Sequence, residues 1–284
     1  MQIEKSGKIG FCYGVRRAVD ILEKEAKQRS GVESLGEVVH NRHVMRRLAA
    51  GGVKVVQSQA EIKGKAVVLG THGVSPEVEA QITSRQIEII DTTCPFVHRA
   101  QIAAWRLAEA GFFVIVFGDG NHAEVKGILG WAKGKGLAAT DIKSITSLGE
   151  LPRRTGILSQ TTQIPAHFTA FVKGIFDTLY VKDAEIRVVD TICHDIRERQ
   201  AAALDLAQRV DLMLVVGGRN SANTGHLADL CAAAVKTYKI ENAGEINPAW
   251  LVGRQNIGIT AGASTADEEI QEVVDRIKNG LGKK

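Results

Sequence analysis

A short segment that ends in a cysteine recurs along this chain and constrains its fold more than any other feature. Asp91-Thr92-Thr93-Cys94 returns as Asp190-Thr191-Ile192-Cys193, and Gly10-Phe11-Cys12 is a looser relative near the chain start. A helical pattern follows each cysteine at once, so each cysteine lies at a predicted helix entrance. The unpaired N–H groups and the positive dipole end at such an entrance favour a thiolate over a thiol. The sequence therefore predicts three equivalent thiolates of the kind that bind metal.

Predicted strands and helices alternate around these segments. Strand patterns end in polar loops, and we place them near residues 34–39, 65–69, 87–90, 112–117, 155–158, 187–189, 211–216 and 256–259. Helical patterns occur after Cys12 and near residues 43–50, 78–84, 96–110 and 197–210. Continuously apolar strands between helices are typical of parallel sheets, which bind ligands beyond the carboxyl ends of their strands. The strand-end loops and the three cysteines can thus converge on one central site.

The alternation predicts an α/β fold of three similar units with mostly parallel sheets in a pseudo-three-fold arrangement. We expect these units at residues 13–94, 95–193 and 194–284. The third unit has no cysteine at its own end. Residues 1–12, which include Cys12, would complete it if the two termini meet, as they often do in compact folds.

Composition narrows the class of protein and its partners. The 284 residues are 44% hydrophobic and 24% charged, as in ordinary globular proteins, and the apolar stretch Phe112–Phe117 is too short to span a membrane. With no signal-peptide pattern, we expect a cytoplasmic protein whose four cysteines bind metal, act in catalysis or are buried rather than disulfide-bonded. A net charge of +4 with scattered Lys and Arg and 5% aromatic residues argues against nucleic acid. It suits an anionic small substrate or an acidic protein partner.

A set of hydrogen-bond donors stands at predicted strand ends beside glycine-rich backbone. The set consists of His40, His72, Ser221, Asn223 and Ser264. Several N–H and O–H groups, charge from protonated histidine and close backbone approach are what a phosphate or diphosphate pocket needs. No GxxxxGK[ST] pattern occurs, so a nucleotide P-loop is not expected.

His122 and Glu124 flank one position in a predicted loop after the strand near residues 112–117. A carboxyl group held near a metal centre and away from bulk water would serve as a proton donor, with Thr161 as a nearby hydroxyl relay. An exposed loop glutamate is the alternative interpretation of the same spacing.

The three thiolates are compatible with two kinds of metal centre. They could bind zinc with a histidine as the fourth ligand, or a cubane iron–sulfur cluster with one open iron that acts as a Lewis acid. Cys12, Cys94 and Cys193 lie far apart in the chain, which excludes the closely spaced cysteines of a zinc knuckle. Cys231 lies in the apolar helical run Leu227–Ala233, where we expect a buried cysteine rather than a fourth ligand.

Short motifs that span essentially the whole chain carry a specific resemblance. In order, they are Gly10–Val15, Gly36–Asn41, Thr71–Val74, Asp91–Pro95, His122–Val125, Ser159–Thr162, Asp190–Cys193, Asn220–Asn223 and Thr260–Ser264. Together they resemble the 4-hydroxy-3-methylbut-2-enyl diphosphate reductases, the LytB-type iron–sulfur reductases. The resemblance implies the last step of the non-mevalonate isoprenoid pathway, the reductive removal of an allylic hydroxyl that gives isopentenyl and dimethylallyl diphosphate.

The resemblance also implies the site residues. A [4Fe–4S] cluster at the centre of the three units would be held by Cys12, Cys94 and Cys193, and its open iron would take the substrate hydroxyl. The allylic diphosphate would be bound by His40, His72, His122, Thr161, Ser221, Asn223 and Ser264. Glu124 would be the proton source, with Thr161 and His122 as further catalytic residues. The electrons would come from an acidic ferredoxin or flavodoxin, with no nucleic-acid or membrane partner.

The chain departs from the family pattern at three places. Asp195-Ile196 stands where the family usually has Ala-Thr, Ala222 replaces a frequent serine, and Ala266 stands where proline is common. The first departure adds a carboxylate close to the cluster, the second removes one phosphate donor, and the third affects only its loop. Two alternative functions stay open: a non-redox phosphate-binding module with a structural metal, and an iron–sulfur redox sensor.

Overall fold

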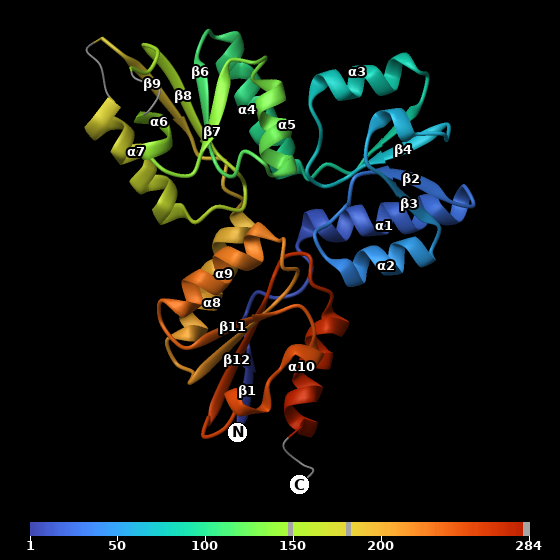
Figure 1. Cartoon of the computed structure of the whole chain (residues 1–284), viewed down its shortest axis with the longest axis vertical. Helices are drawn as coiled ribbons and strands as arrows, with labels where there is room; N and C mark the ends of the chain where they lie inside the picture. The colour runs from blue at the N-terminus through green and yellow to red at the C-terminus, as the bar shows by residue number, and fades with distance from the viewer. Residues whose placement is uncertain (147–149, 180–182, 281–284) are drawn as a thin grey trace. The chain divides into compact units, whose positions relative to one another are not determined.

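The computed structural model describes residues 1–146, 150–179 and 183–280, and the strands within these ranges form three four-stranded sheets (Figure 1). Every strand pair in the three sheets is parallel. The predicted α/β class with three similar parallel sheets is therefore confirmed.

The three sheets share one strand order. The first has the order β3-β2-β4-β5, the second β7-β6-β8-β9 and the third β11-β10-β12-β1. The strands are β1 (Gln2–Lys5), β2 (Val32–Leu35), β3 (Val53–Val56), β4 (Ala66–Leu69), β5 (Glu88–Asp91), β6 (Phe113–Phe117), β7 (Gly136–Ala139), β8 (Arg154–Ser159), β9 (Glu185–Val189), β10 (Leu212–Val216), β11 (Thr237–Ile240) and β12 (Asn256–Ala261). The N-terminal strand β1 pairs with β12 and takes the place in the third sheet that β5 and β9 take in theirs (Figure 1).

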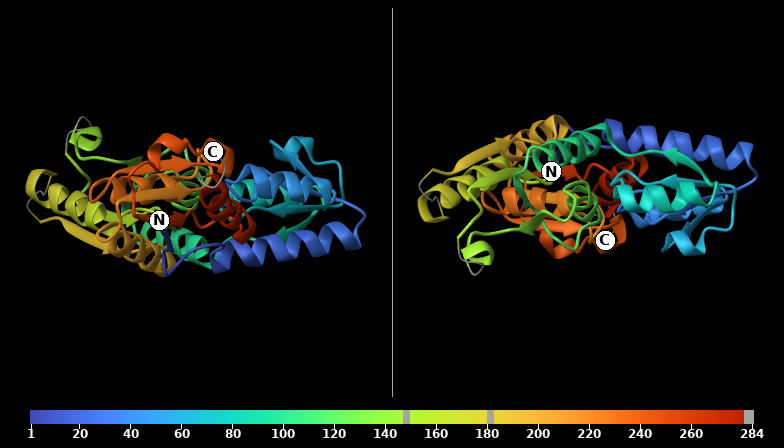
Figure 2. Two further views of the ribbon diagram at one scale, coloured as in Figure 1. Left: turned by 90° about the horizontal axis from the view of Figure 1, so that it is seen from below. Right: turned by 90° about the horizontal axis from the view of Figure 1, so that it is seen from above.

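Helices connect the strands and follow each cysteine. They are α1 (Tyr13–Gln28), α2 (Arg42–Ala50), α3 (Pro76–Ser84), α4 (Pro95–Glu109), α5 (Ala123–Trp131), α6 (Lys143–Thr146), α7 (Pro165–Leu179), α8 (His194–Ala207), α9 (Ala222–Ala232) and α10 (Asp267–Gly280). The described residues also form the short 3-10 helices η1 (Gln59–Glu61), η2 (Ala243–Glu245) and η3 (Pro248–Trp250). Figure 2 shows α1 as the long blue helix. Among the described residues, no helix is both long and apolar enough to cross a membrane.

Helices cover both faces of the third sheet, which explains why its central strand is apolar throughout. Leu212, Leu214 and Val216 of β10 pack with α10, whereas Met213 and Val215 pack with α8 and α9 on the other face. Alternate residues of a strand point to opposite faces, so a strand covered on both sides needs apolar residues at every position. All five residues of β10 are buried.

The second sheet has the same construction. Val114 and Val116 of β6 pack with α4 and α5, and Ile115 and Phe117 pack with α7. Burial on both faces stabilises each such side chain by roughly 1.5–3 kcal/mol relative to exposure. This rigid centre fixes the positions of the loops at the carboxyl ends of β6 and β8.

The chain divides into two compact units. One consists of Met1–Arg16, Val39–Arg47 and His194–Lys284, and the other of Arg17–Val38 and Leu48–Cys193. The third sheet lies in the first of these units, and the other two sheets lie in the second. We call the compact unit with the third sheet unit 1 and the compact unit with the other two sheets unit 2. The strands of each sheet fall within one of the three units predicted from the sequence, while the domain boundaries at residues 94 and 193 stay a prediction.

Candidate functional site

Each of the three recurrent cysteines directly precedes a helix, as predicted. Cys12 precedes α1, Cys94 is the N-cap residue of α4, and Cys193 precedes α8. The backbone N–H of each cysteine donates to the carbonyl oxygen two residues past the end of the neighbouring strand. The N···O distances are 3.0 Å for Cys12 to Ala263, 3.0 Å for Cys94 to Thr71 and 2.9 Å for Cys193 to Thr161. One hydrogen bond thus recurs three times and sets each cysteine at the carboxyl end of its sheet.

The Asp-Thr pair before Cys94 has a structural role in this arrangement. The Asp91 Oδ1 accepts the N–H of Thr93 at 2.8 Å and closes a tight turn. The hydroxyl of the fully buried Thr92 donates to the carbonyl oxygen of Leu69 at 2.5 Å. Asp190 and Thr191 repeat both bonds before Cys193. The recurrent motif is therefore a device that ties the cysteine loop to the central strand.

Burial decides the protonation of Cys12 more than its helix does. The Cys12 Sγ accepts the N–H of Val15 at 3.5 Å, as expected at a helix entrance. Burial nevertheless raises the pKa of the Cys12 thiol, and the N–H groups of Val15 and Gly14 only partly offset it. The N–H groups at the helix entrance thus favour the thiolate, as expected, but burial outweighs them. The positive charge of a bound metal ion is what would shift the balance to the thiolate.

None of the four cysteines forms a disulfide, and Cys231 is buried as predicted. It lies in α9 and packs against Leu206 and Leu227 in the core of unit 1. Burial raises the pKa of its thiol to about 11. A neutral thiol in an apolar cluster fits the expected structural role.

Glu124 is a buried carboxyl group with two hydrogen bonds to one residue. Its Oε1 accepts the backbone N–H of Thr161 at 2.6 Å, and its Oε2 lies 2.9 Å from the Thr161 hydroxyl. The side chain is 2% exposed. Burial raises the pKa of Glu124 to about 7, against the opposing effect of the Thr161 hydrogen bonds. The carboxyl group can therefore change protonation near neutral pH, and the alternative of an exposed glutamate is wrong.

His122 and Glu124 begin a helix instead of lying in a loop. His122 is the N-cap residue of α5, and its Nδ1 accepts the backbone N–H of Glu124 at 3.2 Å. The sequence placed both residues in a loop because a histidine is an uncommon N-cap. The helix start fixes the backbone of both residues, which a loop would not do.

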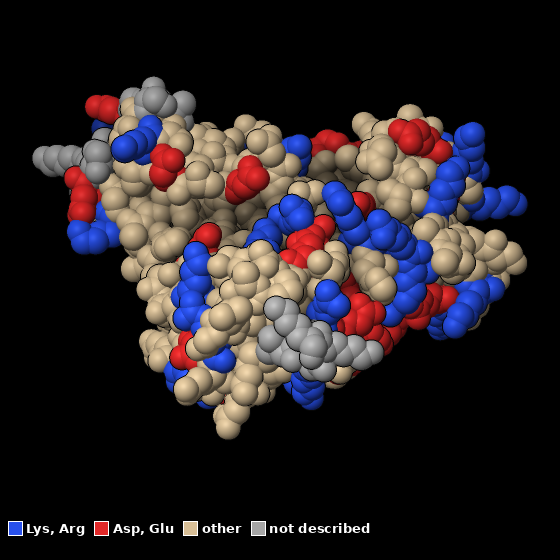
Figure 3. Space-filling model, turned by 60° about the horizontal axis from the view of Figure 1, so that its bottom comes forward, with Lys and Arg blue, Asp and Glu red and all other residues tan. Residues whose placement is uncertain are grey.

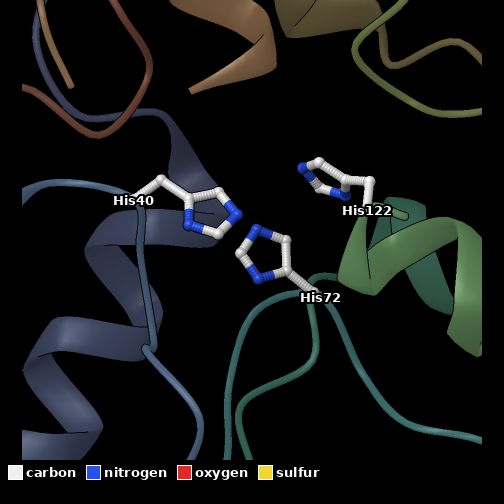
Figure 4. A group of neighbouring side chains, drawn as sticks. All are labelled: His40, His72 and His122. Atoms are coloured by element: carbon white, nitrogen blue, oxygen red, sulfur yellow. The ribbon is translucent and has the colours of Figure 1, made fainter. Parts of the chain in front are cut away.

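His72 and His122 lie against each other in unit 2. Their ring centroids are 5.2 Å apart and their planes are nearly perpendicular, at 86° (Figure 4). His72 comes from the loop after β4, where the next residue, Gly73, has a φ of +64°. A Cβ at Gly73 would lie 2.5 Å from the Gln101 Nε2, so only glycine fits beside His72. Figure 4 also draws His40, which belongs to unit 1.

The start of α9 in unit 1 has a buried amide without a partner. Ser221 is the N-cap residue, and its hydroxyl oxygen accepts the Thr224 N–H at 3.3 Å. Asn223 is 4% exposed, and neither its Oδ1 nor its Nδ2 has a hydrogen-bond partner. Buried polar groups are nearly always paired, so an unpaired amide at a helix N-terminus indicates a polar or anionic ligand.

The predicted site residues divide between the two units. His40, Ser221, Asn223, Ser264 and Cys12 lie in unit 1, and His72, His122, Glu124, Thr161, Cys94 and Cys193 lie in unit 2. In unit 1 the Ser264 hydroxyl donates to the His40 carbonyl oxygen at 3.5 Å, which brings these two together.

Asp195, the main departure from the family pattern, belongs to a charged cluster beside Cys12. Its Oδ1 lies 2.9 Å from the Lys8 Nζ, and its Oδ2 lies 3.5 Å from the Arg199 Nη2. Arg199 is 1% exposed and donates to the carbonyl oxygens of Gly10 at 2.9 Å and Ala261 at 3.1 Å. The cluster fastens the loop before Cys12 to α8.

Sequence reasoning missed Arg199 and also Asn41, although Asn41 stands inside a quoted motif. A signal existed for Asn41, because asparagine before a helical pattern predicts an N-cap. No local signal marks Arg199, whose partners Gly10 and Ala261 are distant in the chain.

Comparison with known proteins gives concordant matches along the chain. The family model described as LytB protein matches residues 3–278. The 4-hydroxy-3-methylbut-2-enyl diphosphate reductase of Dehalococcoides mccartyi strain CBDB1 is 56% identical over 283 residues, which cover 99% of this chain and 100% of the relative.

Two solved structures are similar over 98% of this chain. One, described as (E)-4-hydroxy-3-methyl-but-2-enyl diphosphate reductase, the terminal enzyme of the non-mevalonate pathway, is 36% identical with a TM-score of 0.70, and all of it is covered. The other, the E-1-hydroxy-2-methyl-but-2-enyl-4-diphosphate reductase of Plasmodium falciparum, is 23% identical with a TM-score of 0.91, and 88% of it is covered. Because the sequence identity is so low, the second match shows only that the two proteins share a fold.

Proposed function

Because the chain belongs to the LytB protein family, we propose that it acts as a 4-hydroxy-3-methylbut-2-enyl diphosphate reductase. The family predicted from the sequence motifs is thereby confirmed. In this reaction the allylic C–O bond breaks, a C–H bond forms and the hydroxyl leaves as water. Two electrons and two protons are consumed, and the products are isopentenyl and dimethylallyl diphosphate.

The recurrent setting of the three cysteines is the observation that carries this proposal. Cys12, Cys94 and Cys193 form no disulfide, precede helices and make the same backbone hydrogen bond. An N–H group directed at a cysteine sulfur, as at Cys12, is typical of iron–sulfur ligation. These residues fit a [4Fe–4S] cluster bound by three thiolates. When bound, such a cluster would supply single electrons and one iron with an open coordination position.

We propose that the diphosphate is held by His40, His72, His122, Thr161, Ser221, Asn223 and Ser264. The unpaired Asn223 amide supports this assignment, because a phosphate oxygen would satisfy its Nδ2. The N-terminal position in α9 favours the negative charge of the ligand. Ala222 stands where the family resemblance leads us to expect a serine, so we propose that this chain relies on the flanking Ser221 and Asn223 there.

Glu124 is the proposed proton source, and Thr161 is its proposed relay. With a pKa of about 7, a large fraction of Glu124 carries a proton at neutral pH. A protonated Oε2 can donate to the Thr161 hydroxyl 2.9 Å away, and that hydroxyl can then donate its own proton onward. The Thr161 N–H bond to the Oε1 keeps the carboxyl group oriented during the transfer.

We further propose that the two electrons come from an acidic ferredoxin or flavodoxin. The net charge of +4 supports an acidic partner. On the face drawn in Figure 3, lysines and arginines stand beside acidic side chains. Mixed charge of this kind favours a brief, salt-sensitive encounter over a tight complex.

Anaerobic purification and a reduction assay test the function. We expect a brown protein with about four iron and four sulfide per chain, which reduces the substrate with dithionite and a viologen mediator. Colourless, iron-free protein after cluster reconstitution would favour the phosphate-binding alternative. A cluster-loaded protein that forms no diphosphate product would favour the redox sensor.

A further inference from the structure

We propose that Asn41 and Glu269 are positioning residues that hold the His40 and Ser264 loops together for diphosphate binding. The two form one buried hydrogen-bonded bridge in unit 1, which we call the Asn41–Glu269 bridge. The inference rests on the proposed function, because it assigns the bridge to the same diphosphate site. Neither residue would touch the substrate.

Asn41 uses its whole hydrogen-bonding capacity inside the protein. Its Nδ2 donates to the Glu269 Oε2 at 2.8 Å and to the Ser264 carbonyl oxygen at 2.9 Å. Its Oδ1 accepts the backbone N–H groups of His43 at 2.8 Å and Val44 at 3.1 Å. Two donors and two accepted bonds fix the orientation of the amide. The side chain is 4% exposed, so breaking these bonds would leave buried polar groups unpaired.

Glu269 joins the bridge to a second helix start. Its Oε2 also accepts the backbone N–H of Ala266 at 2.9 Å, so the carboxylate caps α10 from within its first turn. Asn41 directly precedes α2 and caps it, because its Oδ1 accepts two backbone N–H groups of the first turn. One carboxylate oxygen therefore links the starts of α2 and α10, which are far apart in the sequence.

The bridge leaves the backbone of His40 little freedom. His40 directly precedes Asn41, and its carbonyl oxygen accepts the Ser264 hydroxyl at 3.5 Å. The same oxygen packs against Gly218, where even a Cβ atom would overlap it. Gly218 belongs to the loop that leads to Ser221. Three loops with proposed diphosphate residues thus meet around the segment His40-Asn41, and the Asn41–Glu269 bridge is its deepest anchor.

Exchanging Asn41 for aspartate separates helix capping from the bridge. Asn41→Asp keeps an acceptor for His43 and Val44 but removes both donors and sets a carboxylate against Glu269. We expect the Kd of the cluster-loaded protein for inorganic diphosphate to rise about tenfold, because misplaced donors lose binding. The KM for substrate should rise by a similar factor with kcat within about twofold of wild type, as for lost ground-state binding.

The double variant Asn41→Asp/Glu269→Gln reverses the polarity of the bridge. The new amide can donate to the new carboxylate, although it gives up the bond from the Ala266 N–H, so we expect a partial recovery of diphosphate affinity of at least about threefold. Asn247→Asp is the matched control, because Asn247 caps η3 through the Ala249 N–H at 3.0 Å and is exposed. Its diphosphate affinity should equal that of wild type. Amide hydrogen exchange at His43 and Val44 reports whether the α2 cap stays folded.

Two results would overturn the proposal: wild-type affinity in Asn41→Asp, or a double variant as weak as the single one with the α2 amides still protected. A third variant separates this failure from failure of the proposed function. If His40→Ala binds diphosphate as tightly as wild type, the diphosphate assignment itself is wrong. If His40→Ala loses diphosphate binding while Asn41→Asp binds diphosphate normally, only the positioning role of Asn41 and Glu269 is wrong.

Discussion

Glu124 combines complete burial with a protonation change near neutral pH. Its folded-state pKa of about 7 lies above the ordinary value of 4.5, so the folded protein binds this proton more tightly than the unfolded chain. The stability that this proton contributes is fully present below pH 4.5 and is lost as the pH rises through 7. Above that range the buried carboxylate costs up to about 3 kcal/mol.

Stability measured against pH should therefore separate wild type from Glu124→Gln. We expect the free energy of unfolding of wild type to fall relative to that of the variant between pH 5 and 8, by a few kcal/mol at most. Urea unfolding of both proteins at several pH values, in the same metal state, measures the difference. A difference that stays constant with pH would show that Glu124 is ionised throughout.

Turnover should depend on the same proton. We expect Glu124→Gln to lower kcat by about 100-fold or more with KM nearly unchanged, because the amide binds like the carboxyl group but donates no acidic proton. Wild-type kcat should fall as the pH rises above about 7. Steady-state kinetics with an artificial electron donor tests both points, and full activity in the variant would remove Glu124 from this role.

The cysteines should differ according to their settings. We expect Cys12→Ser, Cys94→Ser and Cys193→Ser each to lose bound iron and activity, because each removes one thiolate. Cys231→Ser is the matched control, since Cys231 lies in the apolar cluster of α9. It should keep iron and activity despite some loss of stability. Equal iron loss in that variant would point to a four-thiolate cluster.

Two Asp–Arg pairs with the same i,i+4 spacing have their aspartates in α8 (His194–Ala207), and the arginine of only one of them is buried. Asp195 faces Arg199, which is 1% exposed, whereas Asp205 faces the half-exposed Arg209. Without Asp195, the buried guanidinium would keep two carbonyl acceptors but lose the partly buried carboxylate that it pairs with. We expect Asp195→Ala to lower the free energy of unfolding by about 2 kcal/mol.

Asp205→Ala makes the same change on the same helix and should have no measurable effect, because exposed pairs contribute little. Chemical denaturation of both variants gives the comparison. Equal effects would mean that Asp195 acts through helix propensity and not through Arg199. The cluster iron of Asp195→Ala, measured in parallel, reports whether the loop before Cys12 keeps its place.

At the level of elements, the central strands were predictable and the second strand of each sheet was not. β6 and β10 are continuous apolar runs because helices cover both their faces. The missed strands β1, β3, β7 and β11 are short edge strands, and β7 (Gly136–Ala139) consists mostly of glycine and alanine, which have low strand propensity. For β7, pairing with β6 is what makes the segment a strand.

The candidate site was predictable to a similar degree. Cys12, Cys94 and Cys193 stand out because their motif recurs along the sequence. The Asn41–Glu269 bridge and Arg199 do not, because their roles depend on partners far away in the chain. Local pattern thus predicts which residues carry the chemistry, whereas long-range packing decides which residues orient them.

For the whole molecule, the third sheet depends on its N-terminal strand. β1 pairs with β12, and the partly buried Ile3 packs against the core of that sheet. We expect deletion of residues 2–5 to expose the β12 edge and raise amide hydrogen exchange in β12. The amides of β4 and β8 in unit 2 serve as the internal control. Unchanged protection in β12 would mean that β1 adds no stability.

Val39–Arg47 and β1 have their partners at the other end of the sequence. During synthesis, His40 and Cys12 leave the ribosome long before β12, Ser264 and Glu269 exist. Contacts of such long sequence separation form slowly, since a long loop must close first. Until the last helix, α10, has been synthesised, Asn41 lacks its hydrogen-bond acceptor Glu269. The unit 1 half of the proposed diphosphate site is therefore the part that must assemble last.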